Sequence, residues 1–355
     1  MAPSLASQYP WTNSPLICNA PMGGFATHNL AAEVSRAGGL GFIGPVFGNL
    51  STELEQAREV FRSHPLASSS AHPIDPDLLP LGLGFILWAA KLEDIVWTVA
   101  EYKPAALWLF AAPNATADYK TWTTALRKAS PKSKIWIQTG SVAAALALAR
   151  DCTPDVLVMQ GIDAGGHGLE KGAGIISLVP ETIDTLAENG VQNISVVASG
   201  GIVEGRGAAA AFTLGAEGVV LGTRFLASKE ISVTSPVYVQ AILDGKDGGQ
   251  STIRNKVFDQ LRGANRWPGD YDGRALVNKS FEDWQNGVGL EEIQRLNNEV
   301  EAAGHGFGND GTDGRAALWV GTGIGLVTRI MSAREIVEEV RKDIGRAMEN
   351  TRSRI

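Results

Sequence analysis

The stretch ISVVASGGIVEGRGAAAAFTLGAEGVVLGTRF at residues 194–225 decides the fold class. It begins with the apolar run ISVVASGG (194–201), continues through the Ala-rich segment GRGAAAAFTLG (205–215) and ends with the apolar run GVVLGTRF (218–225). Two β-branched runs joined by a helix-forming segment are typical of a βαβ unit. Because both runs are apolar without alternation, they predict parallel strands that are buried on both faces of a sheet.

The same alternation extends N-terminally from this unit to residue 17. The eight expected strands are 17–22, 40–45, 81–88, 104–110, 133–140, 155–161, 194–201 and 218–225. Their starts are spaced by about 29 residues on average, which is the length of one βα unit. We therefore predict an α/β fold, a (β/α)8 TIM barrel. A doubly wound open sheet is the alternative, but glycines follow most runs and no edge strand is evident.

A barrel of this kind needs about 250 residues, so a chain of 355 residues carries a surplus. We expect the barrel over residues 1–227 and a helical insertion or lid over 228–316, which is more polar. Within it, helices are expected at 252–262 and 289–303, packed over the C-terminal mouth of the barrel. Residues 317–355 are expected to return to the barrel and end in a helix.

Composition excludes several classes of protein. With 31 Lys and Arg against 38 Asp and Glu, the net charge is −7, which argues against a nucleic-acid partner. The two cysteines have no spacing typical of a disulfide scaffold or a metal site, and no membrane span or signal peptide is evident. An intracellular, cytoplasmic enzyme is expected. The C-terminal Ser353-Arg354-Ile355 matches the peroxisomal S-K-L address only loosely.

Glycines follow the last two expected strands in the way that phosphate sites require. Gly200 and Gly201 end one run, and Gly222 and Thr223 end the next. In a TIM barrel these two loops commonly bind phosphate, because exposed backbone N–H groups favour an anion there. One such loop alone would more simply be a tight turn. Two on adjacent strands favour a phosphate-bearing cofactor.

The segment MQGIDAGGHG (159–168) follows the sixth expected strand. Gln160 offers an amide donor and acceptor, and Gly165 lets the backbone approach a planar ligand. His167 is then expected at the mouth of the barrel. A lone histidine is often a surface or capping residue, but this one follows small residues at a strand end. Its imidazole can accept a substrate proton or, when protonated, hold an anion.

Two further candidates lie at strand ends. In NAPMGGF (19–25), Pro21, Met22 and Gly23 would place rigid backbone and a thioether beside a cofactor ring, unless Met22 only fills the core. Gln138 could donate to a ring carbonyl or simply be a polar strand end. The segment VGTGIGLV (320–327) contains part of a dinucleotide fingerprint, but we expect it to form a turn at the mouth. No metal site is expected.

Taken together, these segments resemble the nitronate monooxygenase family, also called 2-nitropropane dioxygenases, which are FMN enzymes on a (β/α)8 barrel. The resemblance covers most of residues 15–228. It rests on NAPMGG (19–24), AGGLGFIG (37–44), MQGIDAGGHG (159–168), ASGGI (198–202) and LGTRF (221–225), which occur in family order.

The resemblance implies FMN as cofactor and His167 as catalytic base. The FMN contacts that the family match implies are Pro21, Met22, Gly23, Gln160, Ala164, Gly165, Gly200, Gly201, Gly222 and Thr223. Asn19 and Gln138 are expected as two further FMN contacts, and at the position of Gln138 some relatives have a lysine. It also implies oxidation of alkyl nitronates, and of neutral nitroalkanes once His167 has removed their α-proton. With O2 the products would be a carbonyl compound and nitrite, by way of a flavin semiquinone.

Other functions stay open from the sequence. An FMN-dependent NAD(P)H reductase of quinones or enoyl thioesters would use the same barrel, and so would a non-redox barrel that binds a phosphate ligand. The partners expected are a small nitronate or nitroalkane and O2, without nucleic acid or membrane. A homodimer is left open.

Overall fold

A computed structural model of the chain describes residues 5–44, 50–66, 73–233 and 235–354. Within these ranges eight parallel strands form one sheet in the order β1-β9-β8-β6-β5-β4-β3-β2. A bridge between Cys18 and Leu40 joins β1 to the residues just before β2 and so closes the sheet. The strands are β1 (Leu16–Asn19), β2 (Phe42–Ile43), β3 (Leu79–Ile86), β4 (Pro104–Phe110), β5 (Lys134–Thr139), β6 (Val156–Gln160), β8 (Ser195–Ser199) and β9 (Gly218–Leu221).

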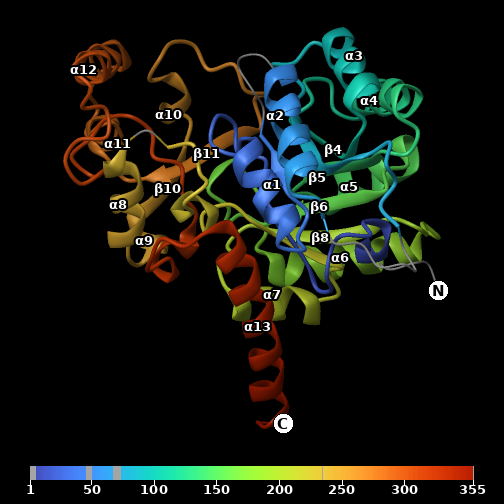
Figure 1. The fold of residues 1–355 in the computed structure, drawn as a ribbon. Coiled ribbons are helices and arrows are strands. Elements are labelled where there is room, and N and C mark those ends of the chain that lie inside the picture. The colour runs from blue at the N-terminus through green and yellow to red at the C-terminus, as the bar shows by residue number, and fades with distance from the viewer. Residues whose placement is uncertain (1–4, 45–49, 67–72, 234, 355) are drawn as a thin grey trace.

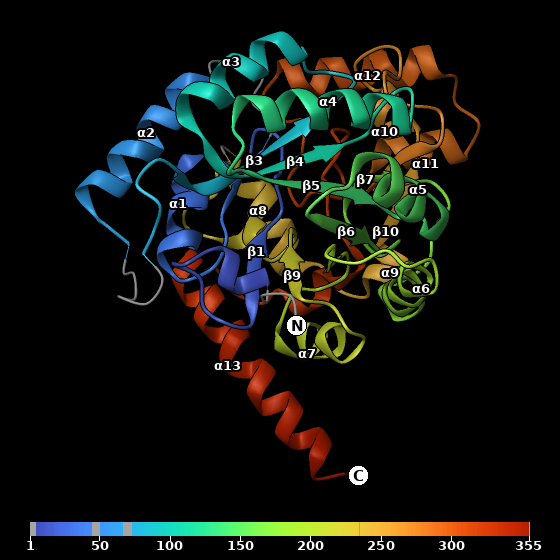
Figure 2. The ribbon, with the colours of Figure 1, turned by 90° about the vertical axis from the view of Figure 1, so that its right-hand side faces the viewer.

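The predicted TIM barrel is confirmed, and each of the eight expected runs carries one of these strands. Pro45, the last residue of one run, and Ile355 lie outside the described residues. Helices lie outside the sheet, as Figures 1 and 2 show. They are α1 (His28–Arg36), α2 (Leu50–Ser63), α3 (Leu92–Tyr102), α4 (Thr116–Ala129), α5 (Val142–Cys152), α6 (Ile175–Glu188) and α7 (Gly205–Thr213).

The inside of the barrel is filled by large aromatic side chains. Phe42, Trp108 and Trp136 pack together there, and the two tryptophan rings stack with centroids 5.7 Å apart. Trp136 Nε1 donates a hydrogen bond to the hydroxyl of Tyr9, at 2.8 Å. The N-terminal segment, which contains the 3-10 helix η1 (Leu5–Gln8), therefore packs against the barrel interior, and the barrel is a core rather than a pore.

After β9 the chain leaves the barrel and builds a separate group of elements. Figure 1 shows them gathered on one side of the barrel, in yellow to orange. They are η2 (Phe225–Ala227), α8 (Pro236–Asp244), α9 (Gly248–Ser251), β10 (Thr252–Asn255), α10 (Val257–Gln260), β11 (Tyr271–Leu276), α11 (Lys279–Gln285) and α12 (Leu290–Ala302).

Part of this segment is a sheet, which the sequence did not indicate. In the described part of the chain, β10, β11 and β7 (Gly166–Leu169) form an antiparallel sheet in the order β10-β11-β7. The helix expected over 252–262 is therefore wrong: its first half is β10, and only the four residues of α10 are helical. Pairing with β11 outweighs the weak local helix preference of this stretch. The helix expected at 289–303 corresponds to α12.

The chain then returns to the barrel through η3 (Thr322–Leu326) and ends in α13 (Ala333–Arg352). A capping box of Ser332 and Glu335 begins α13, and an apolar face that includes Ile336 and Val340 is buried against the body. The last turns of α13 extend beyond the barrel, with the C-terminus at the tip (Figures 1 and 2). Among the described residues, no helix combines the length and apolar character that a membrane span requires.

Candidate active site

A cavity of about 380 Å³ lies at the carboxyl ends of the barrel strands. This is the face where TIM barrels place their chemistry. The sequence predicts thirteen site residues, and twelve of them line this cavity. They are Pro21, Met22, Gly23, Gln138, Gln160, Ala164, Gly165, His167, Gly200, Gly201, Gly222 and Thr223.

Asn19 is the exception. Its side chain is fully buried and does not line the cavity. Instead, its Nδ2 donates to the carbonyl of Phe42 at 2.8 Å, and its Oδ1 accepts the Phe42 N–H at 2.9 Å. The expectation that Asn19 contacts the cofactor is therefore not supported. Its amide replaces strand pairing between β1 and β2, where the barrel closes.

One end of the cavity is built from backbone. Gly201 has φ of +75°, a conformation that strains residues with a side chain. Among the described residues, the N–H groups of Gly201, Gly222 and Thr223 donate to no protein acceptor, although each of these residues lines the cavity. Unpaired N–H groups that face a cavity from two adjacent loops form an anion site.

The turn at 320–325 holds these loops from the outside. The Gly321 N–H donates to Thr223 Oγ1 at 3.0 Å, and the Thr322 N–H donates to the carbonyl of Asp163, also at 3.0 Å. A Cβ atom on Gly165 would lie 2.3 Å from the carbonyl carbon of Val320, so only glycine permits this contact. The segment thus forms a turn at the mouth, as expected, and not a dinucleotide-binding unit.

Gln138 has a defined orientation. Its Oε1 accepts a hydrogen bond from Trp108 Nε1 at 2.9 Å, and both residues are buried and line the cavity. Because the oxygen is occupied, the Nε2 group remains to donate to a ligand. Gln138 is therefore positioned as a hydrogen-bond donor in the wall.

His167 also lines the cavity and lies on β7. Its Nε2 lies 2.5 Å from Asp259 Oδ1, and its ring stacks on Trp267 with centroids 3.7 Å apart and an interplanar angle of 8°. The Trp319 ring packs against it at 4.6 Å. Gln160 Nε2 donates to the His167 carbonyl at 3.0 Å. The imidazole is thus held on several sides.

Two arginines of the insertion hold the loop after β6. Arg254 and Arg274 face one another across β10 and β11, and their guanidinium groups donate to the carbonyls of Ala164 and Ile162. Arg254 is also paired with the buried carboxylate of Asp272 at 2.6 Å. Burial lowers the pKa of Arg274, and the Arg254 charge adds to this shift. The insertion therefore positions the loop that leads into β7 and His167.

The wall around His167 is aromatic. Among the described residues, His167 is the only residue with an ionisable acidic or basic side chain that lines the cavity, apart from the phenol of Tyr238. Burial raises the pKa of Tyr238 far above its ordinary value, so the neutral hydroxyl donates to the carbonyl of Trp319 at 3.1 Å. Trp88, Phe110, Trp267 and Trp319 complete this wall. These aromatic faces offer water few hydrogen-bond partners in this part of the cavity.

Comparison with known proteins identifies the family to which this chain belongs. A model of the nitronate monooxygenase family matches residues 115–343. The nitronate monooxygenase npaC of Metarhizium robertsii is 43% identical over 342 residues, which cover 95% of this chain and 93% of that protein. The chain belongs to the nitronate monooxygenase family. The resemblance noted in the sequence is thereby confirmed, and the chain is an oxidoreductase.

One further relative and two solved structures are also similar to this chain. The nitronate monooxygenase of Neurospora crassa is 38% identical over 363 residues, covering 96% of this chain and 91% of that protein. FabK from Thermotoga maritima superposes over the whole of both chains with a TM-score of 0.71 and 25% identity. A nitroalkane oxidase from Streptomyces ansochromogenes reaches a TM-score of 0.70 at 20% identity over 97% of this chain and 99% of that one, which shows the shared fold.

Sequence reasoning missed the residues that surround His167 in this nitronate monooxygenase. Asp259, Trp267 and Trp319 follow it by 92 or more positions and reach it only through the β7–β11 pairing. No motif marks them. The sole hint was that an insertion expected to cover the mouth must contribute side chains to the cavity.

Proposed function

We propose that this chain binds FMN in the cavity and oxidises alkyl nitronates with O2 to carbonyl compounds and nitrite. One observation supports this most strongly: unpaired backbone N–H groups and His167 line a single cavity. The first suits the phosphate of a cofactor, and the second suits an anionic substrate. We further propose that residues 228–316 act as the cover of this cavity, since Tyr238 and Trp267 line it.

The residues present fit FMN. The loops of Gly201 and Gly222 offer N–H donors for the phosphate, and Gln138 offers an amide donor for a ring carbonyl. Pro21 and Met22 supply an apolar surface for a flat ring. The volume of about 380 Å³ lies within the range of small-molecule sites. When bound, FMN would accept electrons from the substrate and pass them to O2.

The chain itself would bind and orient the substrate. The aromatic wall of Trp88, Phe110, Trp267 and Trp319 contacts the alkyl part and limits access of water. A nitronate is already ionised, so His167 would orient it as an anion. A neutral nitroalkane must first lose its α-proton, and His167 is the base in reach of the cavity.

This assignment predicts a difference between two substrate classes. His167→Ala should lower kcat/KM for a neutral nitroalkane by about 10²- to 10⁴-fold, because it removes the general base. Turnover of the matching nitronate should fall much less. The readouts are nitrite release and O2 consumption by protein loaded with FMN. His305→Ala, an exposed histidine of the same insertion, serves as the control. Equal losses on both substrates would contradict the base role.

The same preparations separate the rival functions. Rapid loss of flavin absorbance with NAD(P)H, without nitrite from nitronates, would support a reductase of quinones or enoyl thioesters. A colourless protein that takes up no FMN would support a non-redox barrel with a phosphate ligand.

A further inference from the structure

We propose that Asp259 is a positioning residue that fixes the tautomer of His167, with the proton on Nε2 and with Nδ1 as the atom that accepts the substrate proton. The catalytic meaning of this inference rests on the proposed nitronate and nitroalkane chemistry, whereas the tautomer itself does not. Asp259 lies outside the motifs that carry the family resemblance.

The contact between the two side chains is specific. Asp259 projects from α10 with only 4% of its side chain exposed, and its Oδ1 lies 2.5 Å from His167 Nε2. A carboxylate only accepts hydrogen bonds, so the shared hydrogen belongs to Nε2. The second oxygen, Oδ2, is buried and makes no hydrogen bond with the described residues. A buried carboxylate of this kind depends on His167 for its compensation.

The other ring nitrogen is free. His167 Nδ1 makes no hydrogen bond with the described residues and is not among the buried polar atoms without a partner. His167 lines the cavity, and its ring plane is fixed by the stacked Trp267. Pairing of His167 with Gly273 fixes the backbone of β7. Nδ1 therefore keeps its lone pair and is accessible, which a general base requires.

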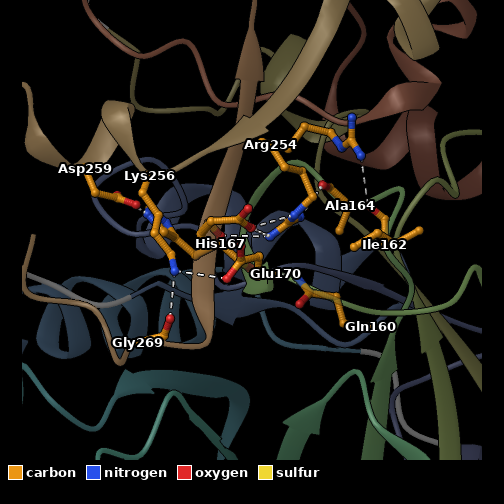
Figure 3. Close-up of polar contacts among 11 residues, drawn as sticks. Gln160, Ile162, Ala164, His167, Glu170, Arg254, Lys256, Asp259 and Gly269 are labelled. Carbon is orange, nitrogen blue, oxygen red and sulfur yellow. Dashed lines mark hydrogen bonds and ion pairs between the residues drawn. The ribbon is translucent and has the colours of Figure 1, made fainter. Parts of the chain in front are cut away.

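Two ion pairs lie near this contact and take up other charges of the insertion. Arg254 binds Asp272 on β10 and β11, and Lys256 binds Glu170 at 3.0 Å (Figure 3). Tyr271 of β11, on the strand paired with β7, has its pKa raised by burial to about 12 and is neutral. Asp259 is thus the carboxylate that faces the imidazole without a cation of its own among the described residues.

Proton removal from a nitroalkane can then be written at defined atoms. The α C–H bond breaks and an N–H bond forms at His167 Nδ1. The electron pair of the broken C–H bond becomes the C=N bond of the nitronate, while the N=O π electrons move onto a nitro oxygen, which takes up the negative charge. Asp259 keeps its negative charge and stabilises the imidazolium that results. A substrate that is already a nitronate does not need this step. The contribution of Asp259 is therefore specific to neutral nitroalkanes.

The test uses Asp259→Asn, which preserves shape but removes the charge. The carboxamide can donate to Nε2, which moves the ring proton to Nδ1 and blocks the base. NMR of protein with 15N-labelled histidine reads the tautomer directly, with or without flavin. We expect a protonated Nε2 in the wild type, and a shift of the proton toward Nδ1 in the variant. The matched control is Asp283→Asn on α11, which removes the carboxylate paired with Arg315. This control should leave the protonation of both ring nitrogens of His167 as in the wild type.

Activity supplies the second readout. Asp259→Asn should lower kcat for a neutral nitroalkane by about 10²- to 10⁴-fold while turnover of its nitronate stays within a few-fold. Asp259→Glu, which restores a carboxylate, should recover part of the loss. Equal losses on both substrates, or no recovery with Glu, would indicate a merely structural role and overturn the proposal. A wild-type tautomer protonated on Nδ1 would overturn it as well. If no nitronate is oxidised at all, the proposed function fails, and the NMR result still decides the role of Asp259.

Discussion

Gly222→Ala would test the phosphate site without disturbing the fold. Gly222 does not have a positive φ, and a Cβ there would meet only Ala20 Cβ at 3.6 Å and Met22 Sδ at 3.9 Å, which are ordinary contacts. Both neighbours line the cavity, so the new methyl group would enter the space beside the unpaired N–H groups. Stability of the flavin-free protein should therefore change by no more than about 1 kcal/mol.

Binding of FMN should weaken much more. A hydrogen bond to a charged group contributes about 1.5–3 kcal/mol, so loss of one phosphate contact raises Kd about 10- to 150-fold. Fluorescence titration of flavin-free protein with FMN measures this, and denaturant unfolding of the same sample measures stability. The matched control is Gly345→Ala on the exposed face of α13, where nothing lies within 4 Å. It should stabilise the helix by about 0.5–1 kcal/mol and leave Kd unchanged. Unchanged FMN affinity in Gly222→Ala would refute the assignment of the phosphate to this loop.

Two further predictions concern the barrel. Asn19→Ala should lower the free energy of unfolding by about 2–4 kcal/mol, because the buried N–H and carbonyl of Phe42 each lose a hydrogen-bond partner. Denaturant titrations measure this loss, and a change of only about 0.5 kcal/mol would contradict the structural role of Asn19. Burial raises the pKa of the Cys18 thiol far above its ordinary value and that of Cys152 to about 11. Since the thiolate is the reactive form, alkylation of native protein should be slow at pH 8 and should accelerate at Cys152 as pH rises toward 11. Unfolded protein should react at both cysteines. Rapid labelling of native protein at pH 7 would contradict the raised pKa values.

The barrel could be predicted because its strands are locally encoded. Runs such as DVLVMQG (155–161) are apolar and β-branched throughout, which is what burial on both faces of a parallel sheet requires. The glycine loops at Gly200 and Gly222 could also be placed, since both follow such runs directly. Strand ends in a closed parallel sheet meet at one face, so the candidates converge without further information.

The surroundings of His167 could not be predicted, because they depend on pairing between distant segments. The strand β7 has the sequence GHGL, in which two glycines carry no preference for a strand. It becomes a strand by pairing with β11, which begins more than 100 residues later. Asp259 follows from the same pairing, since α10 lies between β10 and β11. Asn19 shows a related difficulty, because a polar residue at a strand end can serve either a ligand or the backbone, and here its side chain bonds the Phe42 backbone where the barrel closes.

The most direct test of the central claim is the visible spectrum of purified protein before and after anaerobic addition of an alkyl nitronate. We expect bound oxidised flavin whose absorbance changes within the time of turnover, followed by nitrite release and recovery of the spectrum when O2 is admitted. A flavin that stays oxidised with the nitronate, or a protein that binds no flavin, would contradict it.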